Sequence, residues 1–220
     1  MRTLAILGGT GKEGAGLALR WALSGYSVII GSRSAAKAQT RAAEMNLELG
    51  ADYLCGKANA AAAADADIVI LSVPYGAHRQ TLQAVRAACQ GKVLIDLTVP
   101  LQPPEITAVN LPAGGAAALE AQAILGPDVR VAAAFQNVSA VKLKQLDQSV
   151  DCDVLVCADD PAAKAAAIEL AAAAGLRGVD AGALKNALAV ESLTPVLLHI
   201  NRTYGVQGAG LRITGLDADK

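Results

Sequence analysis

The sequence is poor in aromatic residues, histidine and cysteine, and each shortage narrows what the chain can do. Aromatic residues make up 3% of its 220 residues although 53% are hydrophobic, because much of the apolar content is alanine. Alanine is the best helix former and adds little bulk, so we expect close-packed helices around an aliphatic sheet. The four cysteines and the two histidines show no metal-ligand spacing, so we expect buried structural thiols and no metal site.

The sequence also lacks an excess of charge of either sign and any apolar run long enough to cross a membrane. Its 19 basic and 20 acidic residues give a formal net charge of -1 at pH 7. Scattered charges of this kind provide no basic surface for nucleic acid or for an anionic membrane. The short apolar run after Arg2 is below the length of a secretory signal. We therefore expect a cytoplasmic protein that handles small molecules, with no nucleic-acid or membrane partner.

Short runs rich in valine, isoleucine and leucine alternate with longer alanine-rich stretches that carry periodic charges. This alternation predicts the α/β class, with a Rossmann-type doubly wound parallel sheet and a smaller C-terminal α/β domain. The expected strands are residues 3–7, 27–30, 68–73, 92–97, 131–135, 153–158 and 176–180. The expected helices are residues 12–23, 35–49, 76–88, 116–125, 162–174 and 185–204. The proline-rich stretch 100–115 is predicted to be a long loop, and we place the domain boundary after it, between 1–126 and 127–220.

A glycine pattern stands between the first expected strand and the first expected helix. Gly9, Gly11 and Gly14 satisfy G-x-G-x-x-G, the loop that turns tightly, lets a pyrophosphate approach the backbone and packs helix against strand. The N–H groups of a following helix receive the phosphates. The pattern therefore predicts a dinucleotide site in the segment Gly9, Thr10, Gly11, Lys12, Glu13 and Gly14.

The end of the second expected strand indicates which dinucleotide binds. A site for NAD places Asp or Glu there, about 20 residues beyond the glycines, to hold the ribose 2′-hydroxyl. Here the strand ends in Ser32 and Arg33, with Lys37 one helical turn later. A carboxylate would repel a 2′-phosphate, whereas hydroxyl, guanidinium and ammonium groups bind it by charge-assisted hydrogen bonds. The sequence therefore favours NADP(H) over NAD(H).

No catalytic constellation stands out elsewhere. Tyr53 and Lys57 match the Tyr-x-x-x-Lys pair of short-chain dehydrogenases, but Gly56 between them disfavours the helix which that pair needs. Capping and turn roles explain the acidic pairs Asp65/Asp67 and Asp159/Asp160 more simply than carboxylate catalysis does. We assign no catalytic residue.

Ligands of a doubly wound sheet lie beyond the carboxyl ends of its strands. The segments that follow those ends contain Val73 and Pro74, then Val99, then Gln136 and Ala140. His78, in the first turn of a helix, is equally compatible with a structural and a functional role. In the last helix, Ser192 and Thr194 precede Pro195, which removes a backbone donor; their hydroxyls either contact a ligand or bond back to helix carbonyls.

Taken together, Gly8-Gly9-Thr10-Gly11, Gly31-Ser32-Arg33, Val73-Pro74, Asp180-Ala181-Gly182 and Val190-Glu191-Ser192-Leu193-Thr194-Pro195 resemble the NADPH-dependent coenzyme F420 reductase family. The resemblance runs over the whole chain. It implies hydride transfer between NADP(H) and a deazaflavin, coenzyme F420, held between a Rossmann domain (1–126) and a C-terminal domain (127–220). It also implies a homodimer and cofactor contacts from ten residues, which are Thr10, Gly11, Lys12, Glu13, Ser32, Arg33, Lys37, Val73, Val99 and Ala140.

One position departs from the family. Relatives often carry histidine where this chain has Gln136, close to the deazaflavin site. An NADPH-dependent flavin or quinone reductase is therefore an alternative, with flavin in place of coenzyme F420. A second alternative is a non-catalytic protein that senses NADP(H). Hydride transfer requires the protein mainly to position two rings and exclude water, so the lack of a catalytic triad is expected.

Overall fold

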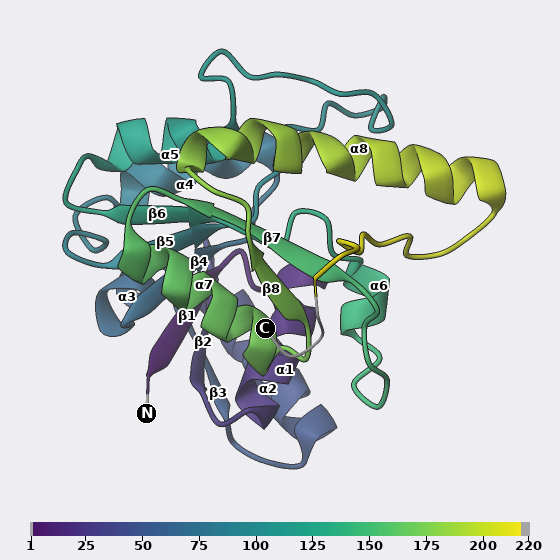
Figure 1. Ribbon diagram of the computed structural model, residues 1–220. Coiled ribbons are helices and arrows are strands. Elements are labelled where there is room, and N and C mark those ends of the chain that lie inside the picture. Colours follow the sequence, from purple (N-terminus) through teal and green to yellow (C-terminus); the bar gives the residue numbers. More distant parts are fainter. Residues whose placement is uncertain (1, 217–220) are drawn as a thin grey trace.

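The computed structural model describes residues 2–216, and it contains an eight-stranded sheet in the order β3-β2-β1-β4-β5-β6-β7-β8 (Figure 1). Its strands are β1 (Thr3–Leu7), β2 (Ser27–Ser32), β3 (Leu54–Ala58), β4 (Ile68–Leu71), β5 (Val93–Asp96), β6 (Arg130–Ala133), β7 (Asp153–Ala158) and β8 (Arg177–Asp180). Strands β1 to β6 are parallel, β7 pairs antiparallel with β6, and β8 is parallel to β7. The first six strands thus have the order of a dinucleotide-binding sheet, and the predicted α/β fold class is confirmed.

The helices cover both faces of the sheet. They are α1 (Lys12–Leu23), α2 (Ala35–Leu49), α3 (Asn59–Asp65), α4 (Tyr75–Val85), α5 (Ala117–Leu125), α6 (Ala140–Leu143), α7 (Pro161–Ala173) and α8 (Ala187–Tyr204), with a 3₁₀ turn at Leu184–Asn186. Helix α8 runs along one face, and the loop between β5 and α5 arches over it (Figure 1). Among residues 2–216 no helix is both long and apolar enough to span a bilayer.

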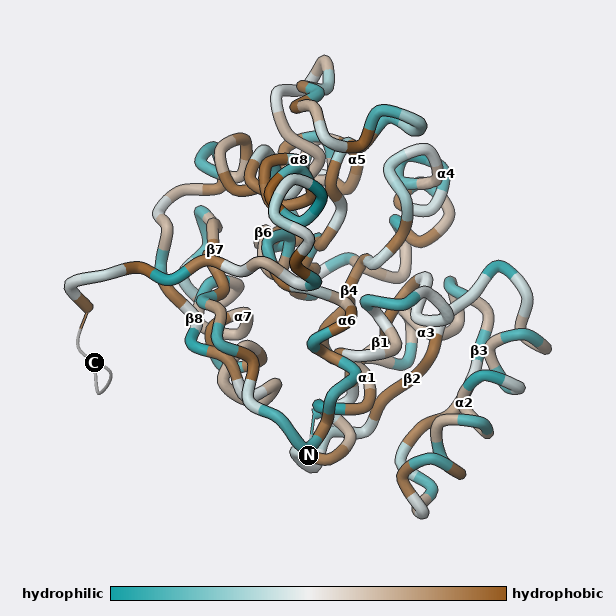
Figure 2. The backbone as a smooth tube through the Cα atoms, turned by 90° about the vertical axis from the view of Figure 1, so that its right-hand side faces the viewer, coloured by the Kyte–Doolittle hydropathy of each residue, from teal (hydrophilic) through white to brown (hydrophobic). Residues whose placement is uncertain are grey.

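Alternating strand residues supply two separate cores. Leu4 and Ile6 of β1 pack toward α1, α2 and α7, whereas Ala5 and Leu7 pack toward α3, α4 and α5. A strand covered on both faces needs apolar residues at every position, which explains the continuous aliphatic runs of the sequence. Figure 2 shows these hydrophobic strands at the centre and a mixed, two-sided pattern along α2.

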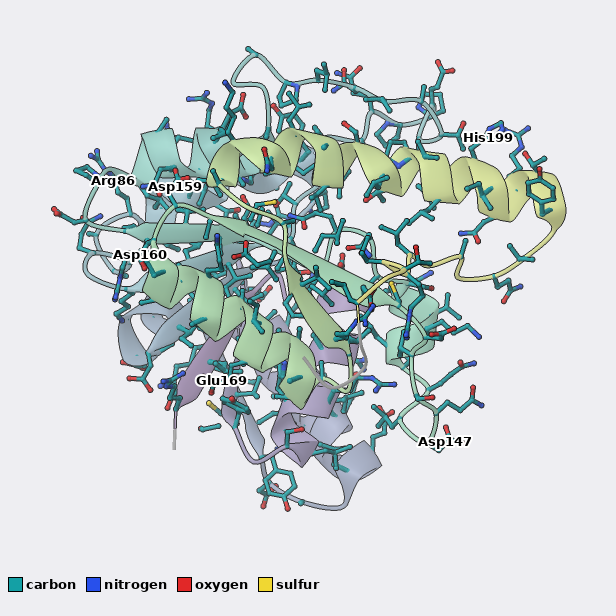
Figure 3. The ribbon with its side chains drawn as sticks, viewed as in Figure 1. Arg86, Asp147, Asp159, Asp160, Glu169 and His199 are labelled. Carbon is teal, nitrogen blue, oxygen red and sulfur yellow. The ribbon has the colours of Figure 1, made fainter. Side chains whose placement is uncertain are left out.

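The element predictions are confirmed most closely where local signals are strong. The strands at 3–7 and 153–158 and the helices at 12–23 and 35–49 have the predicted bounds. Pro161 occupies the first turn of α7, and the carboxylate of Asp160 accepts a hydrogen bond from the backbone of Ala163, as the capping interpretation predicts (Figure 3). The stretch 100–115 is a loop, also as predicted.

Strand β3 and helix α3, between residues 54 and 65, were not predicted from the sequence. Strand β3 contains Gly56, a residue that weakens strands. The structure explains that glycine, because a Cβ atom there would lie 2.2 Å from the backbone carbonyl carbon of Ala38 in α2. Lys57, the second residue of the Tyr-x-x-x-Lys match, lies in this edge strand and pairs with Asp65 rather than with Tyr53.

Candidate active site

A cavity of about 610 Å³ opens beyond the carboxyl ends of β1, β4, β5 and β6. It is within the size range of cofactor and ligand sites. Helix α8 and the segment after it close the opposite side. The lining residues are Gly11, Lys12, Glu13, Ser72, Val73, Pro74, Leu97, Thr98, Val99, Leu101, Gln136, Asn137, Val138, Ser139, Ala140, Val141, Thr194, Leu197, Leu198, Asn201, Val206, Gln207, Gly208 and Ala209.

The glycine loop lines one end of this cavity. Gly8 has φ +78°, and a Cβ atom there would lie 2.3 Å from the carbonyl oxygen of Ser72, so only glycine fits between β1 and β4. Gly11 precedes α1, and no side chain caps the helix, which leaves its first N–H groups available for an anion. Thr10 is exposed beside them. This donor set fits a pyrophosphate.

The second cluster of predicted residues lies outside the cavity, at the end of β2. Ser32 is half-buried, and its hydroxyl accepts a hydrogen bond from the backbone N–H of Ser34 at 3.3 Å. Arg33 and Lys37 are exposed, and neither forms an ion pair with any residue in the described part of the chain. Two exposed cations and a hydroxyl beside the glycine loop fit a 2′-phosphate.

Gln136 stands at the centre of the cavity wall. Its side-chain Nε2 donates to the carbonyl oxygen of Asp96 at 2.8 Å. Its Oε1 is buried and has no hydrogen-bond partner within residues 2–216. An N–H group on a ligand in the cavity would satisfy that acceptor. The preceding residue, Phe135, is buried with φ +74°, and its ring packs edge-on against Trp21 at 5.7 Å, which fixes the turn that presents Gln136.

The hydroxyls of the last helix have different environments. Ser192 donates to the carbonyl oxygen of Leu188 one turn earlier at 2.6 Å, which is the helix back-bond weighed from the sequence, and it does not line the cavity. Thr194 lines the cavity and donates to the carbonyl oxygen of Gln136 at 2.6 Å. Thr194 therefore joins α8 to the cavity wall, and its remaining lone pair is available to a ligand.

Behind this wall His78 and Asp96 form a buried pair. The sequence alone left the role of His78 undecided. His78 Nε2 lies 2.7 Å from Asp96 Oδ2, and both side chains are fully enclosed. Burial disfavours the charged imidazole, but the hydrogen bond and charge of Asp96 outweigh it and raise the pKa of His78. Asp96 also accepts from the backbone N–H of Thr98. The pair thus holds the loop after β5, and His78 is structural rather than exposed to the cavity.

Glu191 is a buried carboxylate on α8 whose role is visible only in three dimensions. Its two oxygens accept the backbone N–H groups of Ala117 and Ala118 at 2.7 and 3.0 Å. It therefore caps α5, whose own preceding residue, Ala116, has no side chain that can cap. Burial raises the pKa of Glu191 to about 7, against the effect of the two backbone donors.

Sequence reasoning missed the contribution of the C-terminal segment. Residues Val206 to Ala209 line the cavity, although the sequence suggested only a glycine-punctuated turn after the last helix. The segment is held by Asn201, whose side-chain oxygen accepts the backbone N–H of Ala209 at 2.8 Å. Gly208 has φ +87° and lies against Ser139. The glycine spacing was the available signal, but it did not indicate where the chain would return.

Of the predicted site residues, the structure brings nine to one cavity and places the others around it. The nine are Gly11, Lys12, Glu13, Val73, Pro74, Val99, Gln136, Ala140 and Thr194. Gly9 and Gly14 support the loop from behind. A Cβ atom on Gly14 would come within 3.1 Å of Gly9 Cα, so the helix and strand approach closely. No group of three or more metal-binding side chains exists in the described residues.

Known proteins similar to this chain carry consistent descriptions. Residues 3–100 match the family described as coenzyme F420-dependent NADP oxidoreductase. The F420-dependent NADP reductase of Methanothermobacter thermautotrophicus is 42% identical, over 97% of this chain and 95% of its own length. That of Methanocaldococcus jannaschii is 39% identical, over 97% and 99%. A solved Arthrobacter structure described as a candidate F420-dependent NADP reductase superposes with TM-score 0.82 at 25% identity, covering 97% of this chain and all of that one.

Proposed function

Because this chain belongs to the family of coenzyme F420-dependent NADP oxidoreductases, we propose that it transfers a hydride between NADP(H) and coenzyme F420, a deazaflavin. The observation that carries this proposal is a single cavity lined at one end by the glycine loop and at the other by α8 and Val206–Ala209. A dinucleotide bound on the loop would bring its nicotinamide end into the space that the C-terminal elements enclose.

The residues of the chain would divide the work of binding. Thr10, Gly11 and the N-terminus of α1 hold the pyrophosphate, and Ser32, Arg33 and Lys37 hold the 2′-phosphate. Val73, Pro74, Val99 and Ala140 provide apolar contact that excludes water from the space between the two rings. Gln136 and Thr194 offer a buried acceptor and a lone pair to ring substituents. The bound rings supply the redox chemistry.

We also propose the finer assignments that follow from the sequence. The division at residue 126, with NADP on the first part and the acceptor completed by 127–220, places α8 and the tail on the acceptor side. Leu188 and Val196 on α8 are 40% and 44% exposed, and Ile106, Val109 and Leu111 of the adjoining loop are also exposed. Such an apolar surface suits a homodimer contact, which light scattering tests. Cys89, Cys152 and Cys157 are buried thiols as expected, whereas Cys55 is exposed, contrary to that expectation; four free thiols suit the cytoplasm.

The decisive experiment offers NADPH two acceptors. The purified protein is mixed anaerobically with NADPH and either coenzyme F420 or FMN, and the absorbance band of each acceptor is followed. We expect bleaching of the deazaflavin band, with much slower reaction when NADH replaces NADPH. Reduction of FMN alone would instead support the flavin reductase, and nucleotide binding without turnover on either acceptor would support a sensing protein.

A further inference from the structure

Glu13 is an acidic side chain in a place where a phosphate loop has no evident use for one. It occupies the last variable position of the glycine pattern, on the first turn of α1, and it lines the cavity. Its carboxylate makes no hydrogen bond or ion pair with any residue between 2 and 216. A half-buried carboxyl without a partner is costly, so its presence calls for a reason.

The surroundings of Glu13 favour its neutral form, although its position in the first turn of α1 brings it near the uncapped N-terminus of that helix. Lys12, beside it on α1, is the other ionisable residue among those that line the cavity. The walls contributed by the loops after β4, β5 and β6, by α8 and by the tail carry apolar, hydroxyl and amide side chains. Burial in this setting raises the pKa of Glu13 to about 8, so the group changes charge close to neutral pH.

The charge of the proposed cofactor also changes within the cavity. The nicotinamide ring carries a positive charge when oxidised and none when reduced, whereas the phosphates are the same in both forms. We propose that Glu13 is a redox-selective binding residue whose ionised carboxylate favours NADP⁺ over NADPH in this cavity. This rests on the proposed function only to the extent that a nicotinamide ring enters the cavity.

The direction of the pH effect follows from the charge states. Below its pKa the carboxyl is neutral and treats both forms of the cofactor alike. As the pH rises through that pKa, the carboxylate gains attraction to the cationic ring and none to the neutral one. A shift of one pKa unit on binding corresponds to about a tenfold change in affinity. The ratio of the two dissociation constants, Kd(NADPH)/Kd(NADP⁺), should therefore rise by about tenfold between about pH 6 and pH 9.

The test measures binding alone, without an acceptor. Dissociation constants for NADP⁺ and NADPH are measured across this pH range for the wild-type protein and for Glu13→Gln, which keeps the shape and removes the titration. Titration of the 2′-phosphate affects both forms equally and cancels in the ratio. Glu48→Gln, an exposed substitution of the same kind on α2, serves as the matched control. We expect a pH-dependent ratio in the wild type and in the control, and a flat ratio in Glu13→Gln.

Two outcomes would overturn the proposal. If Glu13→Gln changes both affinities by the same factor at every pH, the carboxylate acts on the pyrophosphate and not on the ring. If the ratio in the variant still follows pH like the wild type, another group is responsible. Failure of the protein to bind either nucleotide would instead overturn the proposed function, so the two failures are distinguishable. Thermal melting of each variant without ligand shows whether it is folded.

Discussion

At the scale of single residues, two kinds of charged group surround the proposed cofactor. Arg33 and Lys37 are exposed cations outside the cavity, and Glu13 is an acid inside it. Exposed cations are well hydrated and cost little to keep without a partner, whereas an acid inside a cavity is costly. Substitution of Arg33 or Lys37 should therefore test the preference for a cofactor with a 2′-phosphate without disturbing the fold.

Arg33→Ala should weaken NADPH binding by about ten- to a hundredfold, because a hydrogen bond to a charged group contributes about 1.5–3 kcal/mol. NADH has no 2′-phosphate, so its affinity should change little. Isothermal titration with both cofactors measures the difference. Arg41→Ala, on the following helix α2 and paired with Glu44, is the matched control and should alter neither affinity. Equal losses for NADPH and NADH in Arg33→Ala would contradict the assignment.

At the scale of elements, the tail after α8 is fastened to the sheet by one buried acid. Asp153, at the start of β7, accepts hydrogen bonds from Arg177 at 2.9 and 2.6 Å and from the backbone N–H of Ile213 at 2.7 Å. The backbone N–H of Asp153 in turn donates to the carbonyl oxygen of Leu211. Since Val206–Ala209 line the cavity, this anchor determines where one wall of the site lies.

Asp153→Asn should destabilise the protein by about 1–3 kcal/mol and release the tail to proteolysis, because it removes one partner of an enclosed ion pair. Arg177 lowers the pKa of Asp153 below its ordinary value. The contribution of the Asp153 carboxylate to stability is therefore complete above its pKa in the unfolded chain, about 4. It is lost as the pH falls through its lower pKa in the folded protein. The free energies of unfolding of the wild type and the variant, measured in urea, should differ by the full amount at pH 7 and become equal in acid.

Asp151→Asn provides the control for this measurement. Asp151 pairs with Arg212, but its side chain is 84% exposed, so its removal should cost little at any pH. If Asp151→Asn destabilises the chain as strongly as Asp153→Asn does, general surface charge explains the effect and the specific anchor does not.

The same elements show what sequence can and cannot predict. Helix α1 and strand β1 carry continuous local patterns and a glycine motif, and their bounds were predicted residue by residue. Strand β3 is stabilised by neighbours distant in sequence, so a five-residue run containing Gly56 gave no local signal. Glu191 was visible as an unusual acid in an apolar helix, but its role depends on Ala117 and Ala118, more than seventy residues away. Contacts between residues so far apart in the chain produce no regular spacing in the sequence from which they could be predicted.

At the scale of the whole molecule, the sheet continues across the proposed boundary at residue 126. Strand β6 pairs with β5 on one side and with β7 on the other. Trp21 of α1 donates to the carbonyl oxygen of Leu170 on α7 at 2.8 Å, which joins the two parts again. The boundary remains a proposal about function, while each of the two cores contains residues from both parts.

This packing predicts a single cooperative unfolding transition. Trp21 is the only tryptophan of the sequence and lies between the two parts, so its fluorescence reports on their contact. Far-UV circular dichroism reports on helices throughout the chain. The two signals should change at the same urea concentration, as for a two-state domain. Separate midpoints would show that residues 1–126 and 127–220 unfold independently.

The cavity takes its walls from residues as far apart as Gly11 and Ala209, and this span has a consequence for synthesis. A chain emerging from the ribosome completes the glycine loop and its flanking strands early, but the wall formed by α8 and the tail is made last. Nucleotide can therefore meet a partly made protein, whereas the cavity is not enclosed until Ala209 has been synthesised. Retention of both ligands would then distinguish a molecule that contains residues 206–209 from one truncated before them.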